Sequence, residues 1–148
     1  MNIYFICTGN TCRSPMAEAI LRSKAIEGVT VRSAGVSTVD GLPISTNAKT
    51  LIEEADMPYT HVSNAVNAED LAWADLVLTM TMSHKELLLH SFPEVEKKTF
   101  TLKEYVTPGD FGDVHDPYGG SLATYRRTFE ELGRLIEQLK MKLTEDGE

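Results

Sequence analysis

The sequence has few cysteines, no long apolar run and no excess of basic residues. Its two cysteines, Cys7 and Cys12, lie five positions apart in one segment, which makes a poor structural disulfide and suits free thiols in a reducing compartment. No stretch approaches the roughly 20 apolar residues that a membrane span needs. The N-terminus also lacks a basic region followed by a long apolar core. We therefore expect a cytoplasmic protein with no membrane partner.

The charge balance is acidic. There are 22 Asp and Glu residues against 14 Lys and Arg residues, so the formal net charge is −8 at pH 7. Because nucleic-acid binding needs a basic stripe, we expect no nucleic-acid partner. The 148 residues are 42% hydrophobic and 24% charged, which fits a single globular domain over residues 1–148. Any phosphate site must then be locally positive.

Strand and helix signals alternate along the chain, as in α/β proteins. Apolar or β-branched runs predict four strands, at residues 3–6, 29–34, 75–80 and 98–102. Segments rich in helix formers predict helices at residues 16–25, 47–55, 67–73 and 82–91, and a long amphipathic helix from Ser121 onward. The first strand, helix and strand have the length of a right-handed parallel unit.

A distinctive segment, CTGNTCRSP at residues 7–15, directly follows the first strand. A Gly-containing loop that runs into Ser14-Pro15, a typical N-cap and first-turn pair, directs backbone N–H groups and the positive helix end at one point. That point favours an anion. Within it, Cys7 offers a nucleophile and Arg13 a bidentate clamp for oxyanions. The predicted phosphate-binding residues are Thr8, Gly9, Asn10, Thr11, Cys12 and Ser14.

The loop also contains what a cysteine nucleophile needs. A free cysteine has a pKa of about 8.5, and the helix N-terminus, Arg13 and the Ser14 hydroxyl should each lower the pKa of Cys7. In-line attack of the Cys7 thiolate on phosphorus would give a cysteinyl-phosphate, with the amides and Arg13 holding the equatorial oxygens. We expect Asn10 to hold the loop through bonds from its side chain to the backbone.

The leaving group needs a proton, and the irregular segment 107–120, dense in Gly, Pro and Asp, offers acids. We favour Asp116, because Pro117 would hold it extended. Asp110, Asp113 and His115 remain alternatives. Tyr118, next to this acid, is expected to line the mouth of the substrate site.

Two other sets of side chains have simpler explanations. His61, His84 and His90 lack the spacing of metal ligands, which predicts surface or capping positions. Cys12 has two open roles. It either packs within the loop or captures oxidised Cys7 as a reversible disulfide.

Four motifs together resemble the low-molecular-weight protein tyrosine phosphatases. They are CTGNTCRSPMAE at residues 7–18, RSAG at 32–35, ADLVLTM at 74–80 and DPY at 116–118. The resemblance, which spans essentially the whole chain, implies a single domain with a four-stranded parallel twisted sheet flanked by helices on both faces. It further implies Cys7 as nucleophile, Arg13 as phosphate clamp, Ser14 as thiolate stabiliser and Asp116 as general acid and then base. No metal and no other cofactor is implied.

Thr11 departs from the tyrosine-directed members, which commonly carry Ile there, and is similar to the bacterial protein arginine phosphatases. A hydroxyl suits a planar N–H fork better than the edge of an aromatic ring. Gly119-Gly120 also follow Tyr118, where tyrosine-directed relatives often place a second aromatic residue, so Asp116 would serve as a carboxylate partner for a guanidinium. We expect a phosphatase that prefers phosphoarginine on proteins over phosphotyrosine and releases inorganic phosphate.

Two other classes of function compete with a monomeric phosphatase. Arsenate reductases share this fold and loop, but the thioredoxin-linked ones require further cysteines on a neighbouring helix, and residues 82–91 contain none. A non-catalytic phosphate-binding module would have a broken nucleophile or acid, whereas Cys7 and Asp116 are both intact.

Overall fold

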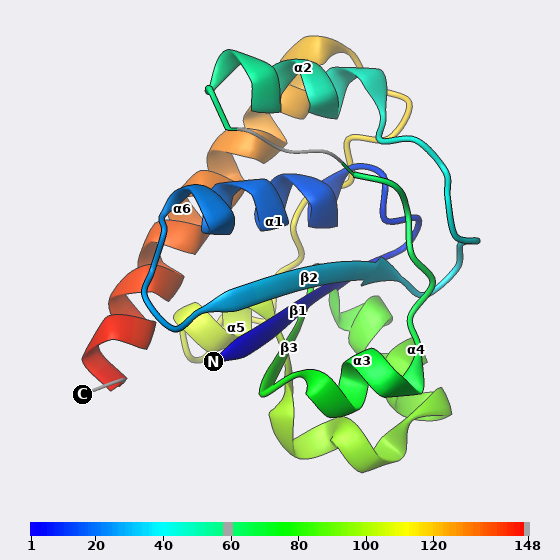
Figure 1. Cartoon of the computed structure of the whole chain (residues 1–148), viewed down its shortest axis with the longest axis vertical. Coiled ribbons are helices and arrows are strands. Elements are labelled where there is room, and N and C mark those ends of the chain that lie inside the picture. Colours follow the sequence, from blue (N-terminus) through cyan, green and yellow to red (C-terminus); the bar gives the residue numbers. More distant parts are fainter. Residues whose placement is uncertain (58–60, 147–148) are drawn as a thin grey trace.

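The computed structural model, which describes residues 1–57 and 61–146, contains one four-stranded sheet (Figure 1). All three strand pairings are parallel, in the order β2-β1-β3-β4. The strands are β1 Asn2–Cys7, β2 Thr30–Gly35, β3 Leu76–Thr79 and β4 Thr99–Thr101. The four predicted strands and the parallel α/β sheet are confirmed.

Helices connect and follow the strands. They are α1 Arg13–Ser23, α2 Thr46–Glu54, α3 Ala68–Trp73, α4 Met82–Ser91, the 3₁₀ helix η1 Pro93–Lys98, α5 Leu102–Val106 and α6 Leu122–Asp146. Within the described residues, none of these helices has the length and apolar content needed to cross a bilayer. Neither η1 nor α5 was predicted from the sequence. The start of α5 did carry a signal, because Thr101 and Glu104 form a capping box.

The helices cover both faces of the sheet (Figure 1). Strand β1 is buried on both sides, as expected for a central parallel strand. Ile3 and Phe5 pack in a core with α1, α2 and α6, whereas Tyr4 and Ile6 pack in a second core with α3 and α4. The predicted amphipathic helix from Ser121 is confirmed as α6, whose apolar stripe lies in the first core.

The start of α1 differs from the sequence prediction. Its N-cap residue is Cys12, and no side chain caps it. Ser14 instead lies in the first turn, fully buried, with its hydroxyl 2.8 Å from the Cys7 sulfur. The predicted capping role of Ser14 is therefore wrong, because its hydroxyl is used inside the loop.

The strand order positions the loop that follows β1. The chain passes from β1 to β2 on one side, and later strands add on the other side, so the order reverses between β1 and β3. Ligands of open parallel sheets bind at such a reversal, beyond the carboxyl ends of the strands. The segments after β1 and after β3 therefore meet at the place where an anion site is expected.

Candidate active site

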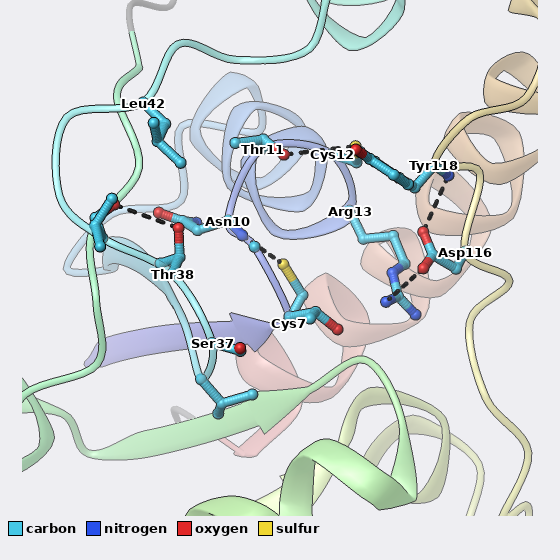
Figure 2. Close-up of a pocket in the computed structure, with 14 residues that line it drawn as sticks. Cys7, Asn10, Thr11, Cys12, Arg13, Ser37, Thr38, Leu42, Asp116 and Tyr118 are labelled. Carbon is cyan, nitrogen blue, oxygen red and sulfur yellow. Dashed lines mark hydrogen bonds and ion pairs between the residues drawn. The ribbon is translucent and has the colours of Figure 1, made fainter.

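A cavity of about 780 Å³ opens at the carboxyl end of β1 (Figure 2). Three segments line it. They are residues 7–13, the loop that follows β2 at Val36, Ser37, Thr38, Val39 and Leu42, and the acid loop at Asp116 and Tyr118. The structure thus brings together nine of the ten predicted site residues. Ser14 lies beneath them, fully buried.

Arg13 joins the two loops that carry the predicted nucleophile and acid. The residue is 4% exposed, and its side-chain Nη1 donates to the Val114 carbonyl oxygen at 3.0 Å. Its Nη2 lies 3.5 Å from Asp116 Oδ2, in the ion pair drawn in Figure 2. Asp116 Oδ1 accepts a hydrogen bond from the Tyr118 backbone N–H at 3.0 Å. The carboxylate is therefore held at the mouth of the cavity beside the buried guanidinium.

The alternative acids have other partners. Asp113 Oδ1 accepts from the backbone N–H of Met82 at 2.9 Å, and Asp110 Oδ1 accepts from that of Gly112 at 2.9 Å. Neither carboxylate, nor His115, is among the described residues that line the cavity. Of the four candidates, the structure brings only Asp116 to the loop of Cys7.

Asn10 organises the loop from within. It is fully buried and has a positive φ of 57°, a conformation that asparagine adopts more readily than most residues. Its Oδ1 accepts from the backbone N–H of Asn64 at 2.8 Å, which is the expected bond to the backbone. Its Nδ2 donates to Ser14 Oγ at 2.8 Å and to Ser33 Oγ at 2.9 Å. Ser33 Oγ in turn donates to the buried Glu18 carboxylate at 2.6 Å.

These bonds determine the role of the Ser14 hydroxyl. A serine oxygen carries one proton, and Ser14 Oγ already accepts from the Asn10 amide. Its own proton has no acceptor among the described residues other than Cys7 Sγ, 2.8 Å away. Ser14 is a donor to the sulfur, which is the arrangement that favours a thiolate.

The pKa of Cys7 reflects two opposed influences. Burial of the side chain, which is 3% exposed, raises the pKa of the thiol above its usual value. The hydrogen bonds from Ser14, the charge of Arg13 and the Asn10 backbone N–H at 3.3 Å act in the opposite direction. The predicted lowering by Ser14 and Arg13 is present, but desolvation of the buried sulfur outweighs it.

Two histidines that were predicted at surface or capping positions contact the loop. His84 Nε2 lies 2.8 Å from Thr8 Oγ1, and His61 Nε2 donates to the Asn10 carbonyl oxygen at 2.6 Å. His84 is 4% exposed, so a surface position is excluded, and its ring bonds the Thr8 hydroxyl. Burial and the charge of Arg13 lower the pKa of His84 to about 4. No local sequence signal marks either ring, since each lies more than 50 positions from the residue it contacts.

Cys12 is a buried residue of the segment that lines the cavity. Its buried Sγ is 3.3 Å from the Tyr125 hydroxyl and 3.6 Å from Ser45 Oγ. Both cysteines are free thiols. These contacts fit the packing role of Cys12, and the capture of oxidised Cys7 stays a prediction. Thr11 lines the cavity, with its hydroxyl 3.8 Å from Cys12 Sγ.

The loop after β2 approaches the phosphate loop closely. The backbone N–H groups of Val36 and Ser37 donate to the carbonyl oxygens of Cys7 and Thr8 at 2.9 and 3.0 Å. A Cβ atom on Gly35 would lie only 2.4 Å from the Thr8 carbonyl oxygen. Glycine at this position therefore permits the contact.

In the described part of the chain, no group of three His, Cys, Asp or Glu side chains is placed to hold a metal ion.

Comparisons with known proteins agree with this geometry. The sequence profile of the family described as low molecular weight phosphotyrosine protein phosphatase matches residues 2–148. A protein-arginine-phosphatase of Bacillus subtilis is 47% identical over 149 residues, which cover 99% of each chain. The low molecular weight protein-tyrosine-phosphatase PtpB of Staphylococcus haemolyticus is 41% identical over 140 residues, which cover 95% of this chain and 98% of that protein.

A solved structure extends the likeness to the fold. It is the YwlE arginine phosphatase in a C7S mutant with a phosphorylated active-site serine. Its TM-score with the present structure is 0.94 at 45% identity, and the match covers 99% of this chain and 97% of that one.

Proposed function

Because the chain belongs to the low molecular weight phosphotyrosine protein phosphatase family, we propose that it hydrolyses phosphoarginine on proteins through a cysteinyl-phosphate intermediate. The observation that carries the proposal is the meeting of Cys7, Arg13 and Asp116 around one cavity. A nucleophile, an oxyanion clamp and a carboxylic acid are the groups that a two-step phosphoryl transfer requires.

In the first step, the phosphoryl group lies over the loop, with its oxygens bound by the backbone N–H groups and the Arg13 guanidinium. The Cys7 thiolate, favoured by the Ser14 donor, attacks phosphorus. The sulfur–phosphorus bond forms and the phosphorus–nitrogen bond breaks. Asp116 gives its proton to the leaving guanidine nitrogen, which is strongly basic and leaves poorly without it.

In the second step, water attacks the cysteinyl-phosphate. The Asp116 carboxylate takes a proton from the water, and inorganic phosphate departs as the sulfur–phosphorus bond breaks. The Cys7 thiolate is regenerated as the leaving group, and the hydroxyl of Ser14 stabilises it. The phosphorylated active-site serine of the related arginine phosphatase mutant supports a covalent phosphoenzyme.

The preference for phosphoarginine rests on the cavity mouth. Thr11 offers a hydroxyl where an apolar side chain would favour an aromatic ring. Asp116 already pairs with one guanidinium, that of Arg13, and its half-exposed carboxylate has room for a second one. The arginine-directed relative from Bacillus subtilis supports this choice. Phosphotyrosine is the second candidate, because the PtpB relative, named as a tyrosine phosphatase, is 41% identical.

The proposal extends to partners and location. The substrates are phosphorylated proteins, recognised through the modified side chain, because the acidic chain offers little long-range attraction to them. We assign the protein to the cytoplasm, since both cysteines are free thiols, as in a reducing compartment.

A comparison of two substrates tests the proposal. Matched phosphoarginine and phosphotyrosine peptides are hydrolysed by the wild type and by Thr11→Ile, with kcat/KM measured for each. We expect the wild type to prefer phosphoarginine and Thr11→Ile to shift the ratio toward phosphotyrosine. Thr144→Ile, on the exposed end of α6, is the control for the same chemical change.

Preference of the wild type for phosphotyrosine, or an unchanged ratio of the two kcat/KM values in Thr11→Ile, would refute the substrate assignment. Turnover that persists in Cys7→Ser would refute the mechanism.

A further inference from the structure

We infer that His84 is a positioning residue that makes the Thr8 hydroxyl a hydrogen-bond donor to the phosphoryl group. The inference rests on the proposed function in one respect, namely that the cavity binds a phosphoryl group. It adds a side chain from the first turn of α4 to the residues that determine how the phosphate is held.

The two side chains meet because of the strand order. Thr8 directly follows β1, and His84 lies in the first turn of α4, which follows the neighbouring strand β3. His84 Nε2 lies 2.8 Å from Thr8 Oγ1. The imidazole is buried, at 4% exposure, whereas Thr8 is exposed and lines the cavity. The hydrogen bond therefore runs from the interior to the wall of the site.

The ring is held on a fixed helix start. Thr81 caps α4, and its hydroxyl accepts from the His84 backbone N–H at 3.0 Å. Asp113 Oδ1 accepts from the Met82 N–H, and the Val114 N–H donates to the Met80 carbonyl oxygen, both at 2.9 Å. These bonds tie the helix start to the loop that carries the proposed general acid. The ring thus has a fixed position relative to both loops of the site.

The other ring nitrogen indicates the tautomer. His84 Nδ1 is buried and has no hydrogen-bond partner among the described residues. A proton on Nδ1 would leave a buried N–H donor without an acceptor, whereas a proton on Nε2 leaves only a lone pair unused. Orphaned buried donors are the rarer and costlier case. The structure therefore favours the Nε2–H tautomer.

This tautomer fixes the direction of the Thr8 proton. With Nε2–H donating, Thr8 Oγ1 accepts one bond and its own proton is free to turn toward the cavity. The ring is neutral at pH 7, because burial and Arg13 lower its pKa to about 4, although Asp113 and Asp116 act in the opposite direction. A neutral ring donates through Nε2 without adding a second charge beside Arg13.

A matched pair of substitutions tests the inference. In His84→Gln, the side-chain amide nitrogen occupies the ε position and retains a donor near Nε2. In His84→Asn, the amide ends at the δ position and falls short. We expect the affinity for inorganic phosphate, measured as its inhibition constant, to stay within about twofold in His84→Gln and to fall about tenfold in His84→Asn, as for a lost bond to a charged group. His90→Asn, exposed on the same helix, is the control.

A double-mutant cycle and a spectroscopic signature separate positioning from a merely structural role. Thr8→Val should weaken phosphate binding as much as His84→Asn, and the double variant should lose no more than either one. Nitrogen chemical shifts of the wild-type ring should show the proton on Nε2. A proton on Nδ1, additive losses in the double variant, or equal losses in His84→Gln and His84→Asn would each overturn the inference. These measurements use inorganic phosphate and require no protein substrate. A failure to hydrolyse phosphoarginine would therefore refute the proposed function but not the role of His84.

Discussion

The side-chain amide of Asn10 donates a hydrogen bond to the Ser14 hydroxyl at 2.8 Å, so the Ser14 oxygen accepts from Asn10 and keeps its own proton for another partner. The only further polar atom bonded to that oxygen, among the described residues, is Cys7 Sγ at 2.8 Å. The orientation of the amide is fixed in turn by the Asn64 backbone N–H, which binds Asn10 Oδ1. A chain of directed bonds thus runs from an exposed loop to the proposed nucleophile.

The first prediction concerns this chain of bonds. Asn10→Asp replaces the N–H donor by a carboxylate oxygen, which would accept the Ser14 proton and withdraw it from sulfur. We expect the pKa of Cys7 to rise in Asn10→Asp and in Ser14→Ala, because each change removes a donor to the thiolate. The rate of Cys7 alkylation by iodoacetamide as a function of pH measures this pKa.

Asn64→Asp is the control for the same chemical change. Its side chain is exposed and bonds the Val62 carbonyl oxygen, whereas its contact with Asn10 uses only the backbone. An unchanged alkylation profile in Asn10→Asp would show that the amide does not direct the Ser14 proton.

The second prediction concerns the close contact at Gly35. In Gly35→Ala, the new Cβ would lie 2.4 Å from the Thr8 carbonyl oxygen and 3.1 Å from the Asn10 nitrogen. Both are backbone atoms, so the loop itself must move. We expect the free energy of unfolding in urea to fall by about 1–3 kcal/mol, as for overpacked sites, together with a loss of phosphatase activity.

Gly133→Ala provides the matched comparison. A Cβ at this position in α6 meets nothing within 4 Å among the described atoms. Alanine should stabilise the helix by about 0.5–1 kcal/mol relative to glycine. Equal effects of the two substitutions would contradict the assigned role of Gly35.

The third prediction is a dependence of stability on pH. The pKa of His84 is about 4 in the folded protein, below the usual 6.5 that it regains on unfolding. The unfolded state therefore binds more protons between these values, and the stabilising contribution of His84, complete above pH 6.5, is lost as the pH falls toward 4. Since Gln does not titrate, the free energy of unfolding of the wild type should fall more steeply between pH 7 and 4.5 than that of His84→Gln.

We expect the fall in the free energy of unfolding between pH 7 and pH 4.5 to be about 1–2 kcal/mol larger for the wild type than for His84→Gln. Urea unfolding at several pH values measures both slopes. Parallel pH profiles would show that His84 titrates normally in the folded protein.

The parts of the molecule that local sequence determines were predictable. Strand β1 and the loop after it follow from an apolar run and a Gly-containing segment before a helix, and this placed Cys7 and Arg13 together. Asp116 was favoured over Asp110, Asp113 and His115 because Pro117 follows it, and the resemblance to a family implied it as the general acid. Its ion pair with Arg13 was not predicted.

The remaining features depend on tertiary structure. His84 meets Thr8 only because β3 lies next to β1, and the strand order cannot be obtained from the periodicity of each segment. The effect of burial on the pKa of Cys7 was missed for a similar reason. The sequence displays the donors around the sulfur but not the depth at which the sulfur is buried. Ser14 was assigned to a helix cap because Ser-Pro is a common cap signal, whereas its hydroxyl is used by Asn10 and Cys7.

The last prediction separates the proposed general acid from its neighbours on the same loop. Asp116→Asn removes the proton donor at the cavity mouth, so kcat for phosphoarginine should fall by about 10²–10⁴-fold, the usual contribution of general acid catalysis. An aryl phosphate with a good leaving group needs less protonation, so the fall in kcat caused by Asp116→Asn should be smaller for that substrate. Asp113→Asn keeps an amide oxygen that can still accept from the Met82 N–H, so its kcat should stay close to that of the wild type. Because the two changes are chemically identical and lie three residues apart, a fold defect common to the loop would affect both variants. An equal loss in both, or a loss in Asp116→Asn that does not depend on the leaving group, would assign the proton transfer to another residue.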